Sequence, residues 1–177
     1  LMPLATFTSD GSDATASFTS GINSTYDKYL FIINNIHPQT DNTTFGFNGS
    51  IDSGSNYNVT KTTTFFRGTQ EENDSSAALS YETGKDIAQG TGDQQLAQSL
   101  SADNDGNVSG KLLLFKPSST TFVKHFIATM NETHGGDISI NSHVAGYFNT
   151  TSAVDAIRFQ MASGEIQGGT IQMFGVH

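Results

Sequence analysis

The sequence predicts an all-β protein, an antiparallel β-sandwich of the jelly-roll type, folded as a single domain over residues 1–177. Three observations support this prediction. Apolar residues recur at every second position through most of the chain, which is the period of a half-buried strand. Only 14% of the residues are charged, so Ser, Thr, Asn and Gly supply most of the polar surface. Turn dipeptides with glycine separate the alternating segments at the spacing of sandwiches and barrels, and a closed β-barrel is the competing architecture.

The first expected strand covers residues 26–36 and contains the run Tyr29-Leu30-Phe31-Ile32-Ile33. Because this run is apolar at odd and even positions, we expect it to be buried on both faces, as a central strand is. Residues 43–51 alternate instead, with Phe45, Phe47 and Ile51 on one face. Asn48-Gly49 lies inside this pattern, where a β-bulge is the alternative to a turn.

The rest of the chain divides into further strands and one long polar stretch. Strands are expected at residues 60–66, 112–115, 122–130, 138–148, 156–161 and 171–176. The run at 112–115 is again apolar on both faces. Residues 70–98 are polar and weakly periodic, so we predict an extended loop with one short strand at 79–81. A short helix around residues 93–100 is a further expectation within this region.

Charge and composition exclude several classes of partner. The chain has 8 Lys and Arg residues against 17 Asp and Glu residues, a formal net charge of -9. This balance leaves no basic footprint for nucleic acid, and it disfavours an anionic membrane surface. No apolar run approaches the roughly 18 residues of a transmembrane helix. The chain has no cysteine, which excludes disulfides, thiolate metal sites and cysteine nucleophiles.

The sequence carries no motif of a known catalytic type. It has no His-Glu-x-x-His and no Gly-x-Ser-x-Gly, and residues 164–169 lack the Lys and hydroxyl of a phosphate-binding loop. Ser, His and Asp are plentiful, but a catalytic triad is defined by geometry and not by composition. We therefore expect a protein that is not an enzyme, with no catalytic residues and no cofactor.

Two groups of residues are candidate binding sites. Asp103, Asp105 and Asn107 offer oxygen atoms at alternate positions, as calcium prefers, although the EF-hand pattern fails because Leu114 stands where the closing carboxylate belongs. A hairpin turn built on Asp105-Gly106 is the favoured interpretation of this segment. The candidate residues for stacking against a sugar are the aromatic residues Tyr57, Phe65, Phe66 and Tyr81. The alternative is that these rings belong to the core.

Three segments of the C-terminal half resemble recurrent segments of known proteins. They are residues 113–126 (LLFKPSSTTFVKHF), residues 146–159 (GYFNTTSAVDAIRF) and residues 163–175 (SGEIQGGTIQMFG). The sequence around residues 26–41 fits the same pattern. On these segments the chain resembles poorly characterised virion structural proteins of aquatic bacteriophages, either head-decoration proteins or β-domains of tail fibres and spikes. The shared motifs are packing and turn signatures and transfer no catalytic residue.

The resemblance implies a non-enzymatic component of the exterior of a phage virion, assembled in the host cytoplasm. Its expected partners are other copies of itself, other virion proteins and a glycan of the host surface. The alternative function is that of a carbohydrate-binding, lectin-like domain that recognises a receptor.

A homotrimer or a higher symmetric array is expected on independent physical grounds. A two-layer sandwich buries only one face of each sheet, whereas the runs at 29–33 and 112–115 are apolar on both. The second face must then be covered by residues 70–98 or by a neighbouring subunit.

Overall fold

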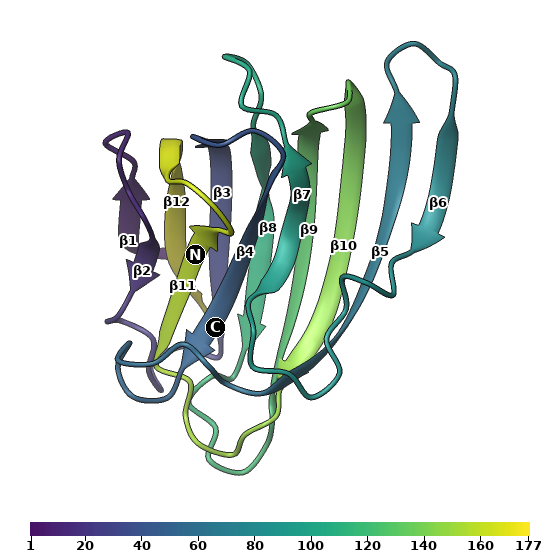
Figure 1. Cartoon of the computed structure of the whole chain (residues 1–177). Helices are drawn as coiled ribbons and strands as arrows, with labels where there is room; N and C mark the ends of the chain where they lie inside the picture. Colours follow the sequence, from purple (N-terminus) through teal and green to yellow (C-terminus); the bar gives the residue numbers. More distant parts are fainter.

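The computed structural model describes all 177 residues and consists of strands joined by turns and loops, with no helix (Figure 1). The strands are β1 (Met2–Thr8), β2 (Ala16–Phe18), β3 (Lys28–Pro38), β4 (Thr43–Ser50), β5 (Lys61–Glu71), β6 (Ala77–Tyr81), β7 (Gln94–Leu100), β8 (Val108–Phe115), β9 (Lys124–His134), β10 (Ile138–Phe148), β11 (Ala156–Met161) and β12 (Ile166–Val176). Every pairing between them is antiparallel. The prediction of an all-β antiparallel fold is confirmed.

The strands form one sheet that curls back on itself until it nearly closes into a barrel. Its larger part follows the order β1-β12-β3-β8-β9-β10-β5-β6, and its smaller part follows β7-β4-β11-β2. A single residue pair, Leu100 with His134, joins the two parts through β7 and β9. The smaller part lies over one face of the larger part, while β5 and β6 extend beyond it (Figure 1). One face of the larger part therefore points inward and the other points away from the core.

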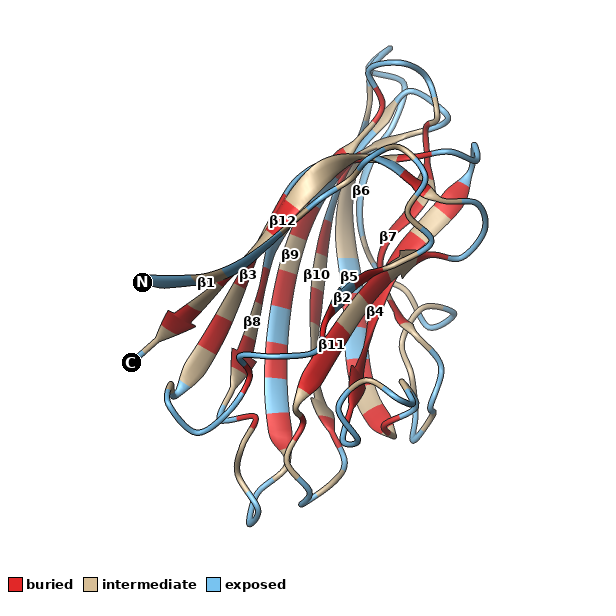
Figure 2. Ribbon diagram, turned by 90° about the vertical axis from the view of Figure 1, so that its left-hand side faces the viewer, coloured by how far each residue is buried: buried red, intermediate tan, exposed pale blue.

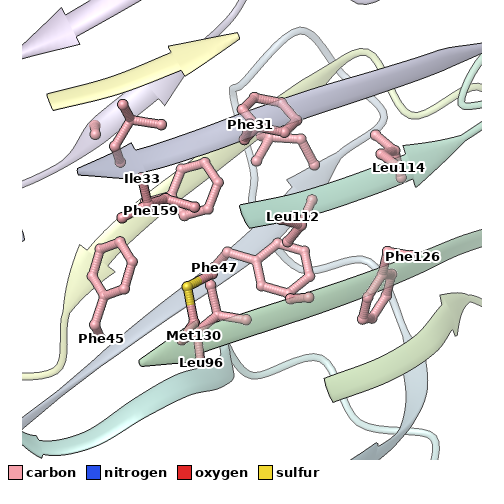
Figure 3. Close-up of a cluster of buried hydrophobic side chains, with 14 of the residues drawn as sticks. Phe31, Ile33, Phe45, Phe47, Leu96, Leu112, Leu114, Phe126, Met130 and Phe159 are labelled. Atoms are coloured by element: carbon pink, nitrogen blue, oxygen red, sulfur yellow. The ribbon is translucent and has the colours of Figure 1, made fainter. Parts of the chain in front are cut away.

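The core lies between the two parts and is dominated by phenylalanine (Figure 3). Phe159 of β11 occupies its centre, with ring centroids 5.5 Å from Phe31 of β3, 5.8 Å from Phe45 and 6.1 Å from Phe47. Phe47 in turn meets Phe126 of β9 edge to face at 4.9 Å. Such aromatic contacts stabilise the fold beyond the burial of their area, and here they connect the two parts of the sheet.

The structure corrects several expectations for residues 70–98. The long loop is shorter than predicted, because β5 continues to Glu71, β6 occupies Ala77–Tyr81, and β7 begins at Gln94. The helix expected at 93–100 is wrong. Leu96 and Leu100 of β7 are buried in the core, and β7 pairs with β4, so tertiary contacts override the helical preference of Ala, Gln and Leu.

Other differences are local. The strands β1 and β2 have no counterpart in the prediction, since β2 has only three residues and the apolar alternation of β1 changes parity between Leu4 and Ala5, at a register shift. Asn48-Gly49 forms neither a turn nor a bulge, because both residues pair in regular register with β11. Glycine is needed at position 49, where an added Cβ would lie 2.8 Å from the ring of Phe148.

The expectation that β3 and β8 are buried on both faces is wrong for the single chain. Tyr29, Phe31 and Ile33 point inward and are buried, whereas Leu30 and Ile32 point outward and remain half-exposed. The same alternation runs along β8 and β9, where Figure 2 shows buried and exposed bands in turn along β9. The outward apolar residues of these strands are therefore left without a covering layer.

Candidate functional site

The outward side chains of β12, β3, β8, β9, β10, β5 and β6 form a continuous surface, which we call the outer face. A row of apolar residues crosses this face in register from strand to strand: Phe174 lies opposite Leu30, Leu30 opposite Leu113, Leu113 opposite Ile127, and Ile127 opposite Ala145. Ile127, the fourth of these five residues, is 52% exposed. A contiguous apolar surface of this kind is typical of an interaction site.

Two shallow hollows flank Ile127 on the outer face. One has a volume of about 630 Å³ and is lined by Phe115, His125, Tyr147 and the threonines of β5. The other has a volume of about 440 Å³ and lies among Leu30, Leu113, Val176 and the side chains of two lysines. No residue between 70 and 98 lines either hollow, so the long β5–β7 connection does not cover this surface.

The charge on the outer face differs from that of the chain as a whole. The chain carries 17 acidic residues, yet none of them stands at an outward position of β12, β3, β8, β9, β10, β5 or β6. The basic side chains on this face are those of Lys28, Lys111, His125 and His143. The face is thus free of the carboxylates that would repel a second acidic molecule.

A further hollow lies beside the outer face, at the loops between β8 and β9 and between β10 and β11. It has a volume of about 960 Å³ and is lined by hydroxyl side chains around Phe115, Phe122 and His125. Phe122 is 73% exposed. The prediction that residue 122 lies on the strand is wrong, because β9 begins at Lys124, and the Ser119 hydroxyl accepts the Phe122 amide at 3.0 Å.

Two buried lysines fix the loops at this end of the molecule. The Nζ of Lys124 donates to the carbonyl oxygens of Phe122 at 3.0 Å and Thr150 at 2.9 Å, which joins the two loops around the Phe122 hollow. The Nζ of Lys61 donates to the carbonyl of Gly92 at 2.6 Å. Burial lowers the pKa of Lys61 to about 8, against an opposing effect of the Asp93 charge. These lysines act as cross-links between segments of backbone.

The predicted sugar-stacking residues are separated by the fold. Phe66 and Tyr81 lie opposite one another on the outer face, and Phe66 stacks on His143 with a centroid distance of 4.9 Å and an interplanar angle of 9°. Phe65 points inward and is completely buried, so its ring is not available to a ligand. Tyr57 lies far from the outer face, under the guanidinium of Arg158 at 4.5 Å.

The segment with Asp103, Asp105 and Asn107 forms the turn between β7 and β8. The Gly106 amide donates to the Asp103 carbonyl at 2.8 Å, and the Asn107 side chain donates to the Asp105 carbonyl at 3.0 Å. One carboxylate oxygen of Asp103 accepts the Ser101 hydroxyl. These contacts are those of a hydrogen-bonded turn, and nowhere in the chain do three or more His, Asp or Glu side chains converge as metal ligands.

One buried ionisable group, Glu132, was not singled out in the sequence. Its two carboxylate oxygens lie 3.0 and 3.1 Å from the amide nitrogen of Gln98, next to the only pair that joins β7 to β9. Burial raises the pKa of Glu132 to about 8, opposed by the Gln98 amide and by the charges of Arg67 and Lys85. The sequence pattern that indicates its burial is the alternation along β9, because Glu132 follows Phe126, Ala128 and Met130 at the inward positions of this strand.

Comparison of the chain with protein-family models and with curated protein sequences finds no match. The structure also contains no helix long and apolar enough to cross a membrane.

Proposed function

We propose that this protein is a non-enzymatic structural component of the exterior of a phage virion, either a head-decoration protein or the outer domain of a tail fibre or spike. It acts by symmetric self-association through the outer face and by surface contacts with other virion proteins. The observation that carries this proposal is the uncovered apolar row across the outer face, from Phe174 to Ala145.

Three features support a second copy of this chain as the occupant of the outer face. The apolar row is continuous in register across β12, β3, β8, β9 and β10, and an apolar centre is typical of a subunit interface. The face lacks carboxylates, so two chains of net charge -9 can approach here with less repulsion than elsewhere. Lys28 and Lys111 lie at the margin of the row, where charged residues of interfaces are normally found. We propose the jelly-roll sandwich, which the number of alternating segments and the spacing of the turns favour, as the finer description of the fold.

Replacement of Ile127, the most exposed residue of the row, by threonine tests the proposal. We expect the dissociation constant for self-association to rise at least tenfold, since the substitution places a hydroxyl within an apolar interface. The fold should persist, because Thr is a good strand residue and position 127 is exposed. Sedimentation velocity at micromolar concentration measures the association, and circular dichroism monitors the fold.

A matched substitution, Asn131→Thr, changes an exposed residue two outward positions along the same strand and should leave association unchanged. Equal association of the wild type and Ile127→Thr would show that the row is not the interface. Antibody labelling of intact particles, seen by electron microscopy, tests the location on the virion.

A carbohydrate-binding domain is the second candidate function, and the Phe122 hollow favours it. An exposed ring surrounded by hydroxyl side chains offers a stacking platform and hydrogen-bonding partners for a pyranose. Under this alternative, Phe122→Ser abolishes binding on a glycan array, while Phe66→Ser, on the outer face, leaves it intact. An array without any bound glycan would contradict the alternative.

A further inference from the structure

The strand β6 is a free edge of the sheet with unusual properties. It pairs with β5 on one side and with nothing on the other. Its sequence, Ala77-Ala78-Leu79-Ser80-Tyr81, contains no charge and no proline, and Leu79 and Tyr81 are 79% and 51% exposed. Natural sheets usually protect exposed edges with lysine, proline or a bulge, because a free edge is a template for another strand.

The direction of the free backbone groups follows from the hydrogen bonds at both ends of β6. The Glu82 amide donates to the Phe65 carbonyl, and the Ser76 carbonyl accepts the Glu71 amide. In an antiparallel pair, every second residue of a strand forms backbone hydrogen bonds with the partner strand. The even-numbered residues of β6 therefore bond to β5. The amide and carbonyl groups of Ala77, Leu79 and Tyr81 therefore point away from the protein.

The opposite edge of the sheet, β1, provides a contrast within the same molecule. It carries Pro3, which removes a backbone donor from the edge. The Ser9 amide donates to the Gly169 carbonyl, so Thr6 and Thr8 are the residues of β1 whose backbone groups point outward. These outward residues are polar, whereas those of β6 are apolar. The two edges are thus not equivalent as sites for strand addition.

We propose that β6 pairs with β6 of a second copy of this chain, in an antiparallel register centred on Leu79. This inference shares with the proposed function the premise that the chain self-associates, but it concerns a different surface. In this register Leu79 faces Leu79 of the other copy, and Ala77 faces Tyr81. The large tyrosine side chain then lies beside the smallest apolar one, and the exposed leucines cover each other. The sequence of the edge is therefore complementary to itself.

Antiparallel pairing brings the start of one β6 beside the end of the other. A twofold contact at β6 also makes the outer faces of two copies continuous. Together with the contact through the outer face, it builds an array and not only a closed dimer.

Single cysteine variants test this register, because the wild-type chain has no cysteine. In a hydrogen-bonded antiparallel pair, directly opposite Cα atoms are about 5.5 Å apart, within reach of a disulfide. Leu79→Cys should therefore cross-link to a covalent dimer under mild oxidation. Ala77→Cys is the register control, because the two substituted positions would be roughly 13 Å apart along the strands. Thr6→Cys is the control at the other edge.

We expect the dimer of Leu79→Cys to form at least tenfold faster than that of either control at tens of micromolar protein. Cross-linking of Leu79→Cys no faster than that of Thr6→Cys would overturn the inference, and faster cross-linking of Ala77→Cys would overturn the register. If wild-type association is lost with Ile127→Thr while Leu79→Cys does not cross-link, the proposed function stands and the β6 contact is wrong. If Leu79→Cys cross-links and Ile127→Thr associates as the wild type does, the β6 contact stands and the outer face is not the interface.

Proline substitutions on the two edge strands test the same contact without a cross-linking reaction. Leu79→Pro removes an outward-pointing donor and leaves the bonds to β5 in place, and Thr6→Pro is the equivalent change on β1. Leu79→Pro should weaken self-association at least tenfold, and Thr6→Pro should leave it unchanged, with circular dichroism of both variants like that of the wild type. Equal association of the two proline variants would contradict the β6 contact.

Discussion

Replacement of Phe159 by alanine is expected to lower the free energy of unfolding by about 4 kcal/mol, the usual cost of a large cavity in a well-packed core. The ring of Phe159 lies at the centre of the core and contacts Phe31 of the larger part of the sheet as well as Phe45 and Phe47 of the smaller part. Its removal therefore weakens the contact between the two parts. Urea unfolding, with the slope of the transition compared between variants, measures the loss.

Phe122→Ala is the matched control, since it removes the same ring from an exposed position. This variant should change the free energy of unfolding by less than about 0.5 kcal/mol. A loss below about 1 kcal/mol for Phe159→Ala, or similar losses for both variants, would be inconsistent with the packing described for the core.

Replacement of Glu132 by glutamine is expected to stabilise the protein at pH 8 by about 3 kcal/mol, of the order found for an uncompensated buried charge. The glutamine side chain keeps an oxygen that accepts the Gln98 amide and carries no charge. In the wild type, burial raises the pKa of Glu132 from its ordinary value of 4.5 to about 8. At a pH between these two values, the folded state therefore keeps the proton of Glu132, whereas the unfolded state has lost it.

The sign of the pH dependence follows from that difference in proton binding. Between pH 4.5 and 8 the folded chain binds more protons at Glu132 than the unfolded chain, so the free energy of unfolding falls as the pH rises. The gain from Glu132→Gln should then be small near pH 4.5 and increase towards pH 8. Glu72→Gln, at an exposed turn position, is the control and should show no such trend. A gain that is independent of pH would contradict a buried, protonated Glu132.

The period-two pattern predicted most of the strands because apolar and polar residues alternate wherever one face of a strand is buried and the other is exposed. It located β10 and β11 with both ends correct, β4 to within one residue, and only the second half of β8. It failed at β7, where the local preference of the residues is helical and only the pairing with β4 imposes a strand. It also missed β1, whose partner β12 lies at the other end of the chain.

The candidate surface was only partly visible in the sequence. The double-sided apolar runs at 29–33 and 112–115 pointed to Leu30 and Leu113, because one face of each run had to remain outside the core. Ile127 and Phe174 join them only through strand register, which no local pattern contains. The β6 edge likewise depends on knowing that β6 is the last strand of the sheet. Phe65 and Phe66 are a further example, since the local sequence does not show which of these two adjacent rings is buried. In the structure, Phe65 faces the core and Phe66 faces the surface.

Multi-angle light scattering of the wild-type chain at micromolar concentration tests the central claim most directly, namely that copies of this chain associate with one another. We expect a mass that is a multiple of 18.9 kDa and that increases with concentration. A particle that stays at 18.9 kDa up to about 100 μM, a concentration at which even a contact of only about 5–6 kcal/mol is partly populated, would contradict it.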